Sequence, residues 1–161
     1  MGKNRIIGLI LVVIIGSIIS QCTSAKRDSS GEITKSGDLK VNDTRLGDCF
    51  TEIPNVTEGV RDISSVKAIS CSEPHSWQIF HKSSITLDTF SVAAATDASN
   101  QVCEIAIESL IMSLSDSQFN EYRNADMNII QPTSSSWARG NKAVDCLIGS
   151  DTQVYYSSIL N

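Results

Sequence analysis

An apolar run close to the N-terminus restricts most strongly what this chain can fold into. Lys3 and Arg5 precede fourteen uncharged and mostly branched residues, Ile6–Ile19, which read IIGLILVVIIGSII. A basic start followed by an apolar stretch is the pattern of an export signal, which does not belong to the folded domain. We therefore expect residues 1–25 to be a signal or a membrane anchor, and the rest of the chain to fold outside the cytoplasm.

The residues after this run allow three ways in which the N-terminal segment is processed. The tetrapeptide ISQC, which ends at Cys22, resembles the lipobox of bacterial lipoproteins and predicts lipid attachment at Cys22, although Gln21 stands where a lipobox has a small residue. Residues 6–25 are also long enough, at twenty residues, to span a bilayer as an uncleaved helix. A signal-peptidase site ending at Ala25 would instead release the domain. The lipid anchor and the uncleaved helix both predict a domain that is tethered to the cell membrane on its extracytoplasmic face.

The polar segment that follows divides the anchor from the predicted domain. Residues 26–46 read KRDSSGEITKSGDLKVNDTRL and contain few large apolar side chains, so we expect a flexible polar stalk. The remaining residues, 47–161, are about 115 in number, an ordinary size for one domain. The net charge of −5, without a clustered basic face, argues against a nucleic-acid partner.

Four cysteines lie within the predicted domain, at Cys49, Cys71, Cys103 and Cys146. An even number of cysteines in an exported domain predicts two disulfides. Three pairings are possible, and sequence alone does not select one. We favour Cys49 with Cys71, which would join two neighbouring extended segments, and Cys103 with Cys146, which would join a helix to a strand. The closest two are 22 positions apart, so the short ligand pairs of a structural zinc site are missing, and we expect no metal.

Hydrophobic periodicity predicts an α+β fold. Alternating residues favour strands, and a three- and four-residue spacing over 90–114 predicts one amphipathic helix with Cys103 on its buried face. We expect strands at 47–50, 65–71, 76–82, 127–131, 143–149 and 152–158. Pro74 favours a rigid turn that pairs the second and third strands. The predicted architecture is a small antiparallel sheet with one principal helix packed on a face.

Two of the segments that connect these predicted elements have a predicted local structure. Residues 115–123 favour a short helix capped by Ser115, with Phe119 and Tyr122 directed inward. Residues 133–142 read as a long loop or turn that is anchored by Trp137. In the final strands, we expect Val144, Cys146 and Ile148 to point toward the core.

The order of these segments is similar to that of a known family. GDCF at the start, CSEPHSWQIF next, a helix with one cysteine, and a closing P....W.RG.K..DCL resemble the septum formation-related domain of actinobacteria. The likeness rests on the four cysteines together with Pro74, His75, Trp137 and Gly140. It implies a membrane-attached domain linked to cell division, whose partner is an envelope protein, a division-site protein or a cell-wall component. Gln78 stands where members of the family often carry an acidic residue.

The stretch CSEPHSW, which holds both Cys71 and His75, also raises the possibility of catalysis. A cysteine nucleophile needs a free thiolate beside a histidine, which a disulfide at Cys71 excludes. If the turn curls back, Glu73, His75 and His81 would be metal ligands of an envelope enzyme. The alternative is that His75 binds backbone groups at the turn and His81 lies at a half-exposed strand end. We favour the latter, because a metal site needs a third ligand that is held in place by a second shell of contacts. The chain also has no G-x-S-x-G motif of a serine hydrolase, and the family implies no activity and no cofactor.

The sequence therefore predicts a non-catalytic binding or scaffold module. His75 and Trp137 are the candidate binding residues. Trp137 would be either an exposed aromatic contact of the kind that anchors interfaces or a core residue that fastens its loop to the sheet.

Overall fold

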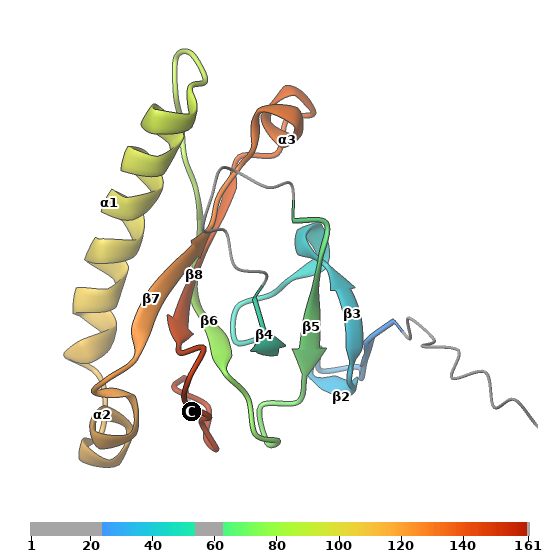
Figure 1. The fold of residues 1–161 in the computed structure, drawn as a ribbon, viewed down its shortest axis with the longest axis vertical. Helices are drawn as coiled ribbons and strands as arrows, with labels where there is room; N and C mark the ends of the chain where they lie inside the picture. The colour runs from blue at the N-terminus through green and yellow to red at the C-terminus, as the bar shows by residue number, and fades with distance from the viewer. Residues whose placement is uncertain (1–23, 54–62, 161) are drawn as a thin grey trace, which may run out of the picture.

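The computed structural model describes residues 24–53 and 63–160. Its centre is a six-stranded sheet of antiparallel neighbours in the order β3-β5-β4-β6-β8-β7, beside a small two-stranded sheet, β1-β2. One long helix lies along the side of the sheet that holds β6, β7 and β8 (Figure 1). The elements are β1 Lys26–Arg27, β2 Ile33–Lys35, β3 Gly37–Lys40, the 3-10 helix η1 Val41–Asp43, β4 Cys49–Glu52, β5 Ser65–Ile69, β6 Trp77–Ser84, α1 Val92–Ile111, α2 Asp116–Tyr122, β7 Asp126–Ile130, α3 Ser134–Ala138 and β8 Ala143–Gly149. The predicted α+β fold with one principal helix is confirmed.

The paired strands β6 and β8 form the middle of the molecule, and both of their faces are covered. Successive side chains of a strand point to opposite faces. Val144, Cys146 and Ile148 face the helix, as predicted, while Leu147 joins a second apolar cluster on the other face. Gly149 lies against β6 so closely that a Cβ there would come within 2.0 Å of the Ser76 carbonyl oxygen. Only glycine fits at that position.

The helix α1 packs on the sheet through its small residues and a disulfide. The Ser91 side chain caps the helix by accepting a hydrogen bond from the Ala94 amide, as helix caps of this type do. Ala95, Ser99 and Cys103 form its buried face. Disulfides join Cys103 to Cys146 and Cys49 to Cys71, so the favoured pairing is confirmed.

Two short helices follow α1 in the chain. The predicted helix at 115–123 is present as α2, where Ser115 and Gln118 form a capping box. Tyr122 is buried and stacks on Tyr155 with 4.3 Å between ring centroids. Phe119, however, is 49% exposed, so its predicted inward orientation is wrong. The segment predicted as a loop around Trp137 contains the helix α3.

The segment 26–46 corrects the predicted domain boundary. It is no flexible stalk, because β3 pairs with β5 along its whole length and places Leu39 in the core, while Ile33 is buried from β2. Arg27 forms an ion pair with the buried Asp48 at 2.6 Å. A strand needs only every second residue to be apolar when one face is solvated, so a polar composition did not exclude strands here. The folded domain therefore begins before residue 47.

One predicted strand pairing and one predicted strand are also wrong. The strands β5 and β6 do not form a hairpin, because β4 lies between them and pairs with both. Residues 152–158 do not form a closing strand, and their one ladder contact is an isolated bridge between Tyr155 and His75. Side chains replace the missing ladder there: Glu121 accepts from the amides of Tyr156 and Ser157.

Candidate functional site

The turn before β6, which the sequence marked as a candidate reactive site, is held in place by the buried ring of His75. His75 is 1% exposed. Its Nδ1 lies 3.0 Å from the Glu73 carbonyl oxygen, to which it donates, and its Nε2 lies 3.3 Å from Tyr122 Oη. The Tyr122 hydroxyl donates in turn to the Ser157 carbonyl oxygen at 2.7 Å. The His75 ring thus ties the turn to α2 and to the C-terminal segment, and the predicted backbone contact of His75 is confirmed.

The three ligands of the metal-enzyme alternative do not come together. Both ring nitrogens of His75 contact protein atoms, the Glu73 side chain is exposed, and His81 lies along β6 opposite Cys146. Across the described ranges, no group of three or more His, Cys, Asp and Glu residues could hold a metal ion. The geometry therefore gives no support to that alternative.

Trp137 fastens α3 to the helix side of the sheet. It is half-buried, its ring centroid lies 5.4 Å from that of Phe90, and Lys142 Nζ lies 4.9 Å from the centroid of the Trp137 ring. Such a cation over an aromatic ring is an attractive contact. Trp137 therefore packs against the apolar cluster on the helix side of the sheet and stays partly exposed.

Membrane attachment concerns residues that the structure does not describe. Cys22 and residues 1–23 lie outside the described part of the chain. Within the part that is described, no helix has the length and hydropathy needed to cross a membrane. The lipid anchor and the uncleaved helix both stay predictions.

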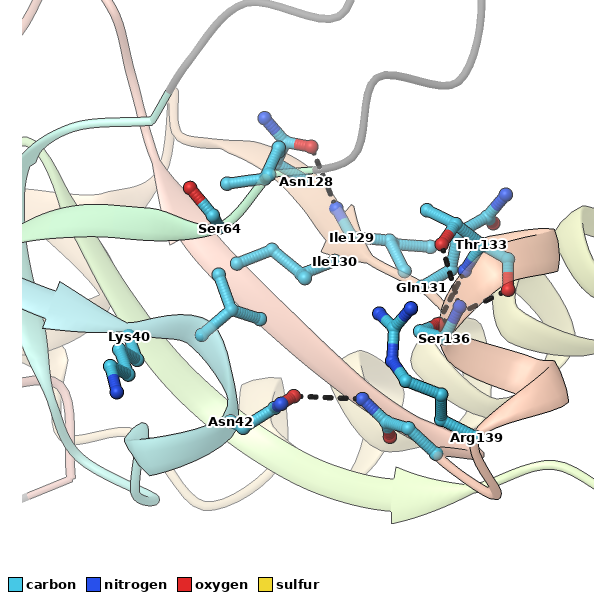
Figure 2. Close-up of a pocket in the computed structure, with 13 residues that line it drawn as sticks. Lys40, Asn42, Ser64, Asn128, Ile129, Ile130, Gln131, Thr133, Ser136 and Arg139 are labelled. Carbon is cyan, nitrogen blue, oxygen red and sulfur yellow. Dashed lines mark hydrogen bonds between the residues drawn. The ribbon is translucent and has the colours of Figure 1, made fainter.

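A groove that the sequence did not point to lies between the two edges of the six-stranded sheet. Its volume is about 340 Å³. One wall comes from the end of β3 and from η1, and the other comes from β7 and the segment that leads through α3 (Figure 2). Because β3 and β7 are the two outermost strands, the curled sheet brings together segments that are far apart in sequence. The side chains of Asn42 and Asn141 join the two walls by a hydrogen bond of 2.8 Å.

The groove has an apolar floor and a polar rim. The buried Ile130 and the half-buried Val41 and Ile63 line its base. Figure 2 shows the Arg139 guanidinium turned into the groove, with Lys40 on the opposite wall. Lining residues within the described ranges include no aspartate or glutamate. The charged residues of this described lining, Lys40 and Arg139, are therefore both cationic, although the whole chain carries a net charge of −5.

An adjoining hollow of about 250 Å³ shares Asn42 and Asn141 with the groove. Among the described residues that line this hollow, Asp145 is the one acidic residue, and it is buried. Lys82 forms an ion pair with Asp145, and Thr44 Oγ1 donates to Asp145 Oδ2 at 2.6 Å. The Asp145 charge is compensated within the hollow, so it does not cancel the positive charge of the groove.

Comparison of the chain with family models, with curated proteins and with solved structures found no match. The resemblance to the septum formation-related domain therefore stays a prediction. Sequence reasoning missed the groove because its two walls are joined only by the folding of the sheet. The one signal in the sequence was Arg139 itself, which stands in a polar segment with no acidic residue between Gln131 and Lys142.

Proposed function

We propose that this chain is a non-catalytic binding module on the extracytoplasmic face of the cell membrane, and that the groove between β3 and β7 is its contact site. The observation that carries the proposal is the groove itself: a concavity with an apolar floor and a few convergent polar groups, which is the usual form of a binding site.

The arrangement of the reactive residue types supports binding over catalysis. Disulfides hold Cys49, Cys71, Cys103 and Cys146. The buried His75 is engaged through both ring nitrogens. Two disulfides also suit a domain that works in an oxidising compartment, in agreement with the export signal at residues 1–25.

The cellular process that we propose is septum formation during cell division. This part of the proposal rests on the resemblance carried by the cysteines, Pro74, His75 and Trp137. The partner would be an envelope or division-site protein or a cell-wall component, reached from a membrane anchor in the N-terminal segment.

The proposal is tested by the localisation of a tagged copy in dividing cells of the source organism. Ser64 lines the groove and is exposed, so Ser64→Trp fills the groove whatever the charge of the ligand. Ser109 is exposed on α1, far from the groove in sequence and on another element, so Ser109→Trp is the matched control. We expect midcell enrichment of the wild type and of Ser109→Trp, and loss of enrichment for Ser64→Trp.

Two results would count against the proposal. A uniform membrane signal from the wild type would refute the link to division. Equal enrichment of all three proteins would refute the groove as the contact site.

A further inference from the structure

We infer that the groove binds an oxyanion, a carboxylate or phosphate group, through the Arg139 guanidinium. This inference rests on the proposed function, because it names the ligand chemistry of the same groove. It follows from the hydrogen-bonding capacity, the charge and the shape of the groove.

Most of the polar side-chain groups that line the groove and have no hydrogen-bond partner among the described residues are donors. Neither Arg139 nor Lys40 has a side-chain partner among the residues that the structure describes. In the amide orientations assigned, the Oδ1 atoms of Asn42 and Asn128 each accept one hydrogen bond, which leaves both Nδ2 groups available to donate. Guanidinium, ammonium and amide N–H groups all donate. A ligand that satisfies them must be rich in acceptors.

The other polar side chains of the groove wall are largely occupied. Gln131 Nε2 donates to Thr96 Oγ1 at 2.9 Å, and Asn141 uses Nδ2 toward Asn42 and Oδ1 toward the Ala143 amide. Ser136 Oγ accepts from the Thr133 amide and donates to the Thr133 carbonyl oxygen. These bonds fix the walls around Arg139, so the groove is held in shape without a ligand.

The charge of the groove selects an anion. Two cations, Arg139 and Lys40, meet no carboxylate in the described lining, and Asp145, the buried acid of the adjoining hollow, is already paired with Lys82. A guanidinium presents its N–H groups in a fork that matches two oxygens of a carboxylate or phosphate. Because Arg139 is turned into the groove (Figure 2), such a group would lie inside it.

The floor of the groove restricts the rest of the ligand. Val41, Ile63 and Ile130 are apolar and line the same groove as Arg139. A volume of about 340 Å³ lies at the small end of ligand-binding pockets. The ligand segment is therefore short, with an anionic group beside a carbon-rich portion.

The test is a titration of the ¹⁵N-labelled full chain in a neutral detergent with sodium phosphate and with sodium acetate. Sodium chloride keeps the ionic strength constant and serves as the reference anion. We expect at least one oxyanion to cause saturable shifts of the Arg139 side-chain signal and of the backbone amides of residues 139–141. Arg139→Gln should weaken that binding by about tenfold or more, since a charge-assisted hydrogen bond is lost. Arg123→Gln, at an exposed arginine outside the groove, should bind as the wild type does.

The outcome of the titration shows whether the groove binds an oxyanion and which class of oxyanion it binds. Saturation by phosphate alone supports the inference with a phosphate source, such as a lipid headgroup or a phosphodiester polymer. Saturation by acetate alone supports it with a carboxylate source, and saturation by both supports an oxyanion site of either kind. No saturation by either anion, or unchanged binding by Arg139→Gln, overturns the inference.

Failure of this inference is distinguishable from failure of the proposed function. If Ser64→Trp abolishes midcell enrichment but no oxyanion binds, the groove is a contact site for a ligand of different chemistry. If an oxyanion binds but Ser64→Trp changes nothing in cells, the anion site exists and the proposed function is wrong.

Discussion

Gln78→Glu should destabilise the domain severely, even though it changes only an amide group to a carboxylate. Gln78 lies on β6 and is 1% exposed. Its Nε2 donates to the Gly47 carbonyl oxygen at 3.1 Å and to Ser158 Oγ at 2.8 Å, and its Oε1 accepts from the Ile159 amide at 2.7 Å. The amide therefore joins the start of β4 to the C-terminal segment by donating and accepting at once.

A carboxylate at this position can only accept. The bond from the Ile159 amide would remain, and Ser158 could reorient to donate, but the Gly47 carbonyl oxygen would face a negative charge. An unsatisfied buried acceptor costs about 1–3 kcal/mol, and an uncompensated buried charge costs about 3–5 kcal/mol. Because relaxation and protonation relieve part of this sum, we expect a loss of about 4 kcal/mol in the free energy of unfolding at pH 7.

The pH dependence of this loss identifies its cause. A protonated glutamic acid has an O–H group that can replace the lost donor, so the loss should shrink as the pH falls from 7 to 5. Urea unfolding followed by tryptophan fluorescence measures it, since Trp77 is buried beside Gln78 on β6. The matched control is Gln101→Glu, at an exposed position of α1. Equal stabilities of the two variants at pH 7, or a loss that does not change with pH, would refute this reasoning.

Three further predictions concern the C-terminal segment and the helix disulfide. Burial opposes ionisation of Glu121, but hydrogen bonds from Ser157 and from the Tyr156 amide outweigh it and hold the pKa below its usual value. This carboxylate therefore contributes stability that is lost as the pH falls below about 4. In urea unfolding, Glu121→Gln should reduce the loss of stability at acid pH, and an unchanged loss would contradict the assignment. Burial raises the pKa of Tyr122, so the stability that the neutral phenol contributes is lost as the pH rises above about 10. Tyr122→Phe should remove this loss at alkaline pH and should lower the free energy of unfolding at pH 7 by about 1 kcal/mol. The same loss at alkaline pH in both proteins would show that another group causes it. Replacing Cys103 and Cys146 by alanine removes a disulfide that closes a loop of 43 residues and should cost about 4 kcal/mol. Urea unfolding of the variant and of the oxidised wild type, both without reductant, measures this loss. A loss below about 1 kcal/mol would contradict the idea that this disulfide stabilises by constraining the unfolded chain.

Local patterns in the sequence predicted the elements that depend on neighbouring residues. The spacing of apolar residues located α1 and its buried Cys103, and the capping preference of Ser115 located α2. The two disulfides followed from the even number of cysteines, and the favoured pairing proved correct.

Arrangements that depend on distant residues were not predictable in the same way. The position of β4 between β5 and β6 and the register of β3 on β5 are set by contacts across the sheet. The polar composition of residues 26–46 hid two buried apolar residues, Ile33 on β2 and Leu39 on β3. The groove has no local signal except Arg139 in its polar segment, because its walls meet only when the sheet curls and Asn42 reaches Asn141.

The most direct test of the account compares the midcell enrichment of three variants in one experiment. The central claim is that the groove is the contact site and that Arg139 holds an anionic group in it. We predict that Ser64→Trp and Arg139→Gln both spread evenly over the membrane, while Ser109→Trp stays enriched at midcell like the wild type. Enrichment of both groove variants at the level of Ser109→Trp would contradict the claim.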